Sequence, residues 1–177
     1  TSPQKPSAVL PRAVMPVHGT GRVRRLLLVG VPAAASELPA GAFGDRAALK
    51  AAVDAWVADP AAAEATHGSI SGWDTSRVDD LSGICESSCY GLFPSSFNDD
   101  VSAWDISRVT NMVFTFYEAD AFNQPLAWDT SKVTLMYSTF ADADAFNSEL
   151  VWDTSQVTDI QWTFYDAENF NQLLTWD

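Results

Sequence analysis

The sequence has few of the residues that bind metals or nucleic acids. Its 177 residues include two Cys and two His, too few for a Cys₄ zinc module, and His18 and His67 are too far apart for the H-x₃₋₅-H spacing of a Cys₂His₂ module. Ten Lys and Arg stand against 23 Asp and Glu, which gives a formal net charge of −13. A body of this charge repels the nucleic-acid backbone, because binding there requires basic surface that releases counterions. We therefore expect no zinc module and no nucleic-acid partner.

Long apolar runs and glycosylation sequons are absent as well. The longest apolar run, residues 26–35, is interrupted by Gly30 and Pro32. It is far shorter than the ~20 residues that a membrane-spanning helix requires. The sequence therefore predicts no transmembrane helix, and any association with a membrane would go through partners. No Asn-x-Ser/Thr sequon occurs, so N-glycosylation gives no support for secretion.

Residues 1–41 form an extended, basic segment rich in Pro and Ala, and its first 36 residues contain no Asp or Glu. A segment without a core of its own is usually disordered unless it lies along its own domain or along a partner. We expect it to anchor the chain to a partner. Its lack of acids fits an organellar transit sequence, which favours an organelle such as a plastid or lumen-like compartment. The cell surface is the alternative location. The candidate partner contacts are Arg22, Arg24, Arg25, Leu26, Leu27 and Leu28.

Residues 42–70 are typical of a helical cap. Asp45 can cap a helix whose apolar residues recur at positions 49, 53, 56 and 57. Asp59 and Pro60 end this helix and can start a second one, which Gly68 would close in a left-handed conformation. Such a unit would shield the open face of the first repeat that follows.

Residues 71–177 contain a repeated Trp-Asp unit. The last four Trp are 24 residues apart, and the first interval is 31 residues. A fixed period in this range is typical of a stacked solenoid, in which each unit buries its apolar face against its neighbours. WD40 propellers also carry Trp-Asp, but their period is roughly 40–45 residues. Four copies begin at Trp73, Trp104, Trp128 and Trp152, and Trp176 starts a fifth, which further repeats or an anchor can follow.

Within each copy, the apolar pattern predicts one helix and one short strand. Counted from each Trp, apolar residues at positions +5, +8, +12 and +15 trace one face of an α-helix. The Ser at +3 stands where an N-cap belongs. A Leu two residues before the next Trp gives the alternation of a strand. The sequence therefore predicts an α/β repeat fold, a solenoid with a short strand plus a helix in each 24-residue coil, preceded by the helical cap.

Aromatic and amide residues recur at fixed positions in the regular copies. Burying one Trp, at ~150–250 Å² and ~25 cal/mol per Å², contributes a gross ~4–6 kcal/mol per coil. The Trp and Phe columns are therefore interpreted as stacked core ladders rather than as a ligand-binding stripe. The Asn after each Phe is interpreted as a hydrogen-bonded ladder at a turn, because an unpaired buried amide is costly. The ladder residues are Trp104, Trp128, Trp152, Phe122, Phe146, Phe170, Asn123, Asn147 and Asn171.

An Asp follows each of these Trp residues. Carboxylates stacked about 4.8 Å apart on neighbouring strands would repel one another unless something compensates. We interpret the column as turn and cap chemistry, in which Asp and Ser oxygens accept backbone N–H groups. Calcium bridging is the alternative, since hard cations favour several carboxylate and carbonyl oxygens, although no D-x-D-x-D-G loop is present. The calcium candidates are Asp105, Asp129 and Asp153.

Cys85 and Cys89 lie in the expanded first copy. A short-loop disulfide is the first interpretation, with a buried reduced pair second and a shared metal third. A disulfide would favour an oxidising compartment.

The usual catalytic motifs are missing. No P-loop, G-x-S-x-G or H-E-x-x-H sequence occurs. Carboxylate pairs such as Asp79 and Asp80 are adjacent in sequence and do not obviously face each other across a cleft. We expect neither enzymatic activity nor a cofactor.

The stretch Phe122-Asn-Gln-Pro-Leu-Ala-Trp-Asp-Thr-Ser-Lys-Val-Thr-Leu-Met136 resembles the repeat of the BspA-like leucine-rich-repeat surface proteins. The same lipoprotein-type pattern is found in some bacteria and many unicellular algae. The resemblance covers about residues 70–177, and residues 43–56 are similar to the lead-in helix of the algal members. It implies a leucine-rich-repeat-like, right-handed solenoid, protein–protein interaction or adhesion, no known catalytic residues and no fixed cofactor. The first copy departs from the pattern through its two-Cys insertion.

Two functions follow from these observations. The leading hypothesis is a non-enzymatic structural or linker subunit of a larger assembly of other protein subunits. Its N-terminal segment would anchor it there, and an organellar or membrane-associated assembly is one of the alternatives. The alternative is a cell-surface adhesion or recognition repeat protein, as the resemblance implies.

Overall fold

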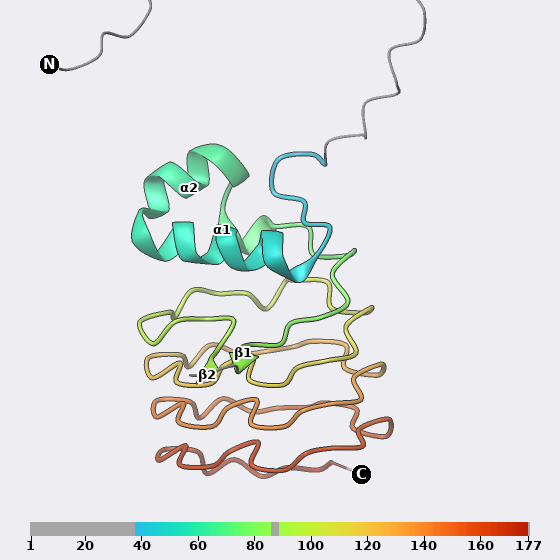
Figure 1. The fold of residues 1–177 in the computed structure, drawn as a ribbon. Helices are drawn as coiled ribbons and strands as arrows, with labels where there is room; N and C mark the ends of the chain where they lie inside the picture. Colours follow the sequence, from blue (N-terminus) through green and yellow to red (C-terminus); the bar gives the residue numbers. More distant parts are fainter. Residues whose placement is uncertain (1–37, 86–88, 177) are drawn as a thin grey trace, which may run out of the picture. The chain divides into compact units, whose positions relative to one another are not determined.

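The described helices precede the first Trp-Asp repeat (Figure 1). The computed structural model describes residues 38–85 and 89–176. Helix α1 is Arg46–Ala58 and α2 is Pro60–His67, followed by the 3-10 turn η1, Ile70–Gly72. Among the described residues, no helix is long and apolar enough to cross a membrane.

The ends of both helices are capped by the residues that the sequence indicates. The Asp45 carboxylate accepts a hydrogen bond from the Ala48 N–H at 2.9 Å, at the start of α1. Asp59 ends α1, and its carboxylate accepts from the Ala62 N–H at 3.1 Å in the first turn of α2. Gly68 ends α2 at φ 77° and ψ −178°, outside the left-handed helical region that the sequence predicts for it, in a positive-φ conformation that glycine adopts at little cost.

Helix α1 buries its apolar side against the first repeat. Leu49, Val53 and Trp56 are buried, and the Trp56 ring meets the Trp73 ring edge-on, with centroids 5.9 Å apart. The Trp56 indole N–H also donates to an Asp99 carboxylate oxygen at 3.1 Å. These contacts cover the apolar surface of the first copy, as a terminal unit must.

Successive repeats lie side by side and are joined by parallel backbone bridges (Figure 1). The bridges connect equivalent positions, seven residues after each Trp. Next to these bridges, from residue 112 to residue 118, every second backbone N–H donates a hydrogen bond to a carbonyl of the following copy. The Met112 N–H donates to the Leu135 carbonyl at 2.8 Å, and the Phe116 N–H donates to the Thr139 carbonyl at 2.8 Å. The bridged residues are Asp80, Asn111, Leu135 and Asp159.

The predicted α/β solenoid, with a strand and a helix in every coil, is wrong. In the part of the chain that the structure describes, α1 and α2 are the only α-helices, and both lie outside the repeats. The strands there are β1, Ile84–Cys85, and β2, Cys89–Tyr90, which form one antiparallel hairpin in the first copy. Residues 91–176 consist of turns and isolated bridges. A leucine-rich-repeat-like architecture is therefore not supported.

The backbone of the repeats is incompatible with an α-helix for two reasons. First, N–H groups close three-residue turns or donate to the next copy; the Thr115 N–H, for example, donates to the Met112 carbonyl at 3.2 Å. Second, φ is positive at two residues, four apart, in each regular copy, such as 57° at Phe114 and 55° at Glu118, whereas a helix needs φ near −60° throughout. A chain that turns every three or four residues also directs positions +5, +8, +12 and +15 inward. The hydrophobic spacing therefore does not separate such turns from a helix.

Side chains replace strand pairing on the side of the repeats that carries the Trp residues. The Trp128 indole N–H donates to the Val101 carbonyl at 3.0 Å, and the Trp152 indole N–H donates to the Leu126 carbonyl at 3.1 Å. These bonds use carbonyls that a paired strand would need for its ladder. The predicted strand before each Trp therefore does not form.

One column of stacked Trp rings and two columns of stacked Phe rings fill the core. Trp128 and Trp152 stack with centroids 6.3 Å apart and ring planes 5° apart, and Trp73 stacks on Trp104 at 6.0 Å. At ~25 cal/mol per Å², burying each Trp contributes a gross ~4–6 kcal/mol, which makes these rings a main source of contact energy between copies. Beside them, Phe122 stacks on Phe146 at 6.0 Å, Phe146 on Phe170 at 5.8 Å, Phe116 on Phe140 at 5.0 Å and Phe140 on Phe164 at 5.5 Å.

Candidate functional site

The Asp that follows each Trp forms a turn with the Ser two residues later. Asp74 accepts hydrogen bonds from the Ser76 N–H at 3.0 Å and from the Ser76 hydroxyl at 2.6 Å. The same backbone bond is repeated in the next three copies, from Ser107, Ser131 and Ser155 at 2.9, 3.1 and 2.9 Å. This geometry is an Asx turn, which fixes the chain direction after each Trp.

These hydrogen bonds stabilise the ionised form of each carboxylate. The Ser76 hydroxyl and, next, the Ser76 N–H lower the pKa of Asp74, with a smaller contribution from Arg77. The Ser107 hydroxyl and N–H likewise lower the pKa of Asp105, although the charges of Asp74 and Asp129 oppose this. The column is therefore ionised at neutral pH.

The calcium candidates Asp105, Asp129 and Asp153 each direct one carboxylate oxygen to the following Ser. Within residues 38–85 and 89–176, no group of three or more His, Cys, Asp or Glu side chains is placed to hold a metal ion. Calcium binding stays a prediction of the sequence.

Asn side chains link successive copies at the turn after each Phe. The Asn123 N–H donates to the Asn98 side-chain oxygen at 2.9 Å. The Asn147 N–H donates to the Asn123 oxygen at 2.9 Å, and the Asn171 N–H donates to the Asn147 oxygen at 3.0 Å. Each amide oxygen thus bonds the backbone of the next copy and sets its register.

A column of buried Thr performs a similar task inside the repeats, and the sequence reasoning missed it. The Thr139 hydroxyl lies 2.9 Å from the Met112 carbonyl and 2.8 Å from the Met136 carbonyl. Thr163 repeats this contact one copy later, with the Met136 and Ile160 carbonyls. The sequence does contain a pattern that could have predicted this column: Thr recurs eleven residues after the Trp in three copies, as a polar residue within an apolar run.

Two predicted sites lie partly or wholly outside the described residues. The candidate partner contacts Arg22, Arg24, Arg25 and residues 26–28 all lie outside the described residues. The backbone register of the β1–β2 hairpin places Cys85 opposite Cys89, but their side chains are not among the described ones. The disulfide therefore stays a prediction.

Aromatic side chains that are not part of the core gather on the surface of three successive copies. We call Phe114, Tyr117, Tyr137, Trp162 and Tyr165 the outer aromatic face. The Phe114 ring lies 5.3 Å from Tyr117 at 76° and 5.5 Å from Tyr137 at 86°. Tyr137 continues to Trp162 at 5.6 Å, and Trp162 to Tyr165 at 5.9 Å. Phe114, Tyr117 and Tyr137, which lie in inner copies, are half-buried, whereas Trp162 and Tyr165, in the last complete copy, are 61% and 59% exposed.

A cavity of about 250 Å³ lies among these rings. Ser138, Ala141 and Asp142 complete its lining. Core rings stack nearly parallel, whereas several outer rings stand at steep angles and therefore present both faces and edges to this space. Sequence reasoning missed this face because its aromatic residues do not recur in every copy: position +10 holds Phe114, Ser138 and Trp162, and position +13 holds Tyr117, Ala141 and Tyr165.

Three carboxylates border the outer aromatic face, each 14 residues after a Trp: Glu118, Asp142 and Asp166. Burial raises the pKa of Asp142, and the negative charges of Asp166, Glu118 and Asp144 raise it further. Burial also raises the pKa of the Tyr117 hydroxyl, with hydrogen bonding to Glu118 as the next cause. The residues that line the cavity include no Lys or Arg. The site therefore combines aromatic rings with uncompensated negative charge.

The backbone at this face is held in a conformation that bulky residues rarely adopt. φ is 57° at Phe114, 57° at Asp142 and 58° at Trp162. A left-handed non-glycine residue costs roughly 1–2 kcal/mol. Bonds to the next copy hold the first two in place: the Phe114 N–H donates to the Tyr137 carbonyl at 3.1 Å, and the Asp142 N–H to the Tyr165 carbonyl at 2.8 Å. Ser138, Glu118 and Asp166 have the same conformation at the equivalent positions of the other copies, so it belongs to the repeat backbone, which positions these side chains.

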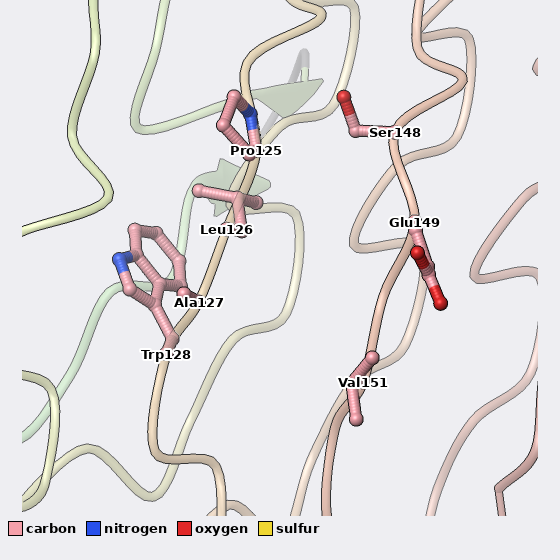
Figure 2. A pocket seen from close by; sticks show the side chains of 7 residues that line it. All are labelled: Pro125, Leu126, Ala127, Trp128, Ser148, Glu149 and Val151. Atoms are coloured by element: carbon pink, nitrogen blue, oxygen red, sulfur yellow. The ribbon is translucent and has the colours of Figure 1, made fainter.

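A second hollow of about 420 Å³ lies between the segments that lead into Trp128 and Trp152 (Figure 2). Pro125, Leu126 and Trp128 line it from one segment, and Glu149 and Val151 lie opposite them on the other. It is larger than the aromatic cavity, but Trp128, the one aromatic residue in its lining, is buried in the core, whereas five aromatic rings line the other cavity. We therefore place the candidate site at the outer aromatic face, where polar and aromatic groups converge.

The repeats are also identifiable by comparison with known proteins. The family described as "Mycoplasma protein of unknown function, DUF285" matches residues 87–177, just over half of the chain. The chain belongs to this family. The DUF285 match spans the outer aromatic face, the Asn ladder and the last three complete repeats, and leaves out α1 and α2. No curated protein and no solved structure matches the chain.

Proposed function

We propose that the chain is a non-enzymatic protein-binding module that serves as a structural or linker subunit of a larger assembly. The observation that carries this proposal is the outer aromatic face, because exposed Tyr and Trp are enriched at protein interfaces. Trp162 and Tyr165 expose more than half of their surface, and their rings continue a row that begins at Phe114.

The Asp that follows each Trp and the described His67 have structural roles. Asp74 and its equivalents accept hydrogen bonds within Asx turns. The His67 ring packs against the rings of Phe43 and Trp73, with centroids 5.6 and 5.8 Å away. Groups used in this way support binding rather than catalysis as the function.

Cell-surface recognition is the second candidate. The DUF285 match is compatible with a BspA-like surface repeat protein, and the lipoprotein-type repeat pattern of residues 122–136 favours that relationship. In this case the outer aromatic face would contact a partner outside the cell rather than another subunit.

The test uses the tagged full chain, expressed in its source cells and recovered under mild conditions for native mass spectrometry. A partner chain of fixed stoichiometry is expected with the wild type. It should be lost in the double variant Tyr137→Gln, Trp162→Ser, in which each residue is replaced by one that a neighbouring copy carries at the same position.

Val151→Ala is the matched control, since it copies Ala127 and changes an exposed residue of the other hollow. A wild-type chain that travels alone and is labelled by a membrane-impermeant reagent on intact cells would replace the assembly role with surface recognition. A partner that stays bound to the double variant would contradict the outer aromatic face as the binding site.

A further inference from the structure

We propose that the outer aromatic face binds an arginine side chain in a basic segment of the partner protein. This inference rests on the proposed function and names the chemistry that the partner must supply. It is carried by the aromatic rings, the bordering carboxylates and the extent of the surface.

The rings provide faces for a planar cation. Phe114 and Tyr137 stand at 86° to each other, so the face of one ring meets the edge of the other beside the cavity. A guanidinium group stacks on the faces of Trp and Tyr through cation–π attraction, and it is more weakly hydrated than an ammonium group. A cavity of about 250 Å³ accommodates one such group with its aliphatic stem.

The carboxylates provide the counter-charge. Asp142 lines the cavity, and Glu118 and Asp166 occupy the same position in the copies on either side. Their mutual repulsion is not relieved by any cation in the cavity lining. A guanidinium group would relieve it, and its fork of donors matches a carboxylate in a bidentate pair.

The extent of the surface favours a protein segment over a small molecule. The aromatic row runs across three copies, from Phe114 to Tyr165, so one cation would occupy only part of it. From Glu37 onward the chain has five Lys and Arg against 23 Asp and Glu. A field of this sign attracts basic segments and speeds their association.

The experiment measures fluorescence anisotropy of labelled peptides with the full chain. The probe is Gly-Gly-Arg-Gly-Arg-Gly-Gly, and the matched peptides carry Lys or uncharged citrulline in place of Arg. Saturable binding of the Arg peptide is expected, with several-fold weaker binding of the Lys peptide and none of the citrulline peptide. L-argininamide, added as a competitor, should bind at least tenfold more weakly than the Arg peptide.

The variants separate this site from general electrostatic attraction. Asp142→Asn should weaken binding at least tenfold. It should still fold, because Asn tolerates the left-handed backbone of this position. Trp162→Ser should weaken binding similarly, and Ser138 shows that the repeat accepts Ser there. Glu149→Gln removes one charge from the other hollow and should leave the affinity unchanged. Circular dichroism and urea unfolding confirm that each variant is folded.

Three outcomes would overturn the inference. Equal binding of the Arg and citrulline peptides would exclude cation recognition. Equal weakening by Asp142→Asn and Glu149→Gln would indicate general attraction to an acidic chain. Argininamide binding as tightly as the peptide would make the occupant a small cation. If instead no peptide binds while native mass spectrometry still shows a partner that depends on Tyr137 and Trp162, the arginine inference fails and the proposed function stands.

Discussion

At the residue scale, hydrogen bonds and burial shift the charged groups of the repeats in opposite directions. Bonds from Ser76 lower the pKa of Asp74 below its ordinary 3.8, so its contribution to folding is present above that pH and is lost as the pH falls through the folded value. The contribution is small because the carboxylate is exposed and screened by solvent. Burial raises the pKa of Asp142. Ionisation of Asp142 therefore costs stability as the pH rises above its ordinary range.

Removing the Ser hydroxyl from one turn should raise the pKa of its Asp. Ser76→Ala deletes the 2.6 Å bond to Asp74 and leaves the backbone N–H bond at 3.0 Å in place. The pKa of Asp74 should therefore move up toward its ordinary value without reaching it, as measured by a ¹³C NMR titration of the carboxyl carbon. Ser131→Ala is the control and should shift Asp129 alone. An unchanged Asp74 titration would show that the hydroxyl does not stabilise the carboxylate.

At the scale of the repeat, amide side chains form the hydrogen bonds between copies that paired strands would otherwise form. The Asn147 oxygen accepts from the Asn171 N–H and from the Gln172 side-chain amide, both at 3.0 Å. Asn147→Ala deletes both bonds. Because a typical hydrogen bond contributes a net ~0.5–1.5 kcal/mol, the variant should lose roughly 1–2 kcal/mol of unfolding free energy in urea.

Asn147→Asp provides the matched control. The carboxylate retains an oxygen at the same place for the Asn171 N–H, so at neutral pH this variant should keep most of the stability that Asn147→Ala loses. Equal losses in the two variants would show that packing of the side chain, rather than its acceptor oxygen, connects the copies.

The sequence predicted which residues of a repeat face inward, but not the backbone that places them there. Val109, Met112 and Phe116 are buried, and their spacing was the basis for the predicted helix. The same spacing arises from successive three-residue turns, so helix and turns could not be separated by periodicity. Within the repeats, the residues with positive φ are Phe, Trp, Glu, Asp and Ser rather than Gly. No residue type in the sequence therefore indicated that the backbone departs from a helix.

The candidate site was harder to predict than the core for a similar reason. Phe122, Phe146 and Phe170 recur in register, and repetition identifies them as one column. Tyr137 and Trp162 stand at different positions in their copies, and they become neighbours only through the stacking of one copy on the next. An alignment of the copies compares only residues at the same position in each copy, so it does not show contacts between residues at different positions, such as Tyr137 and Trp162.

At the scale of the whole described unit, each copy depends on the copies beside it. The Met112 N–H donates forward to the third copy, and the Trp128 indole N–H donates back to the Val101 carbonyl, just before the Trp of the second copy. Backbone bridges, Asn and Thr side chains and the aromatic ladders all join equivalent positions of adjacent copies. A repeat protein of this kind gains stability mainly from the interfaces between neighbours, so damage to one interface spreads.

Replacing the central Trp should therefore unfold several copies together. Trp128 is buried, stacks on Trp152 and contacts Phe116, so Trp128→Ala leaves a cavity and should cost about 3–5 kcal/mol. In hydrogen exchange, residues 104–176 should lose protection as one unit. Trp176→Ala is the control; this ring is only partly buried, so the loss should be smaller and confined to residues 150–176. Loss of protection in the third copy alone, with its neighbours still protected, would contradict coupling through the interfaces and leave each copy stable by itself.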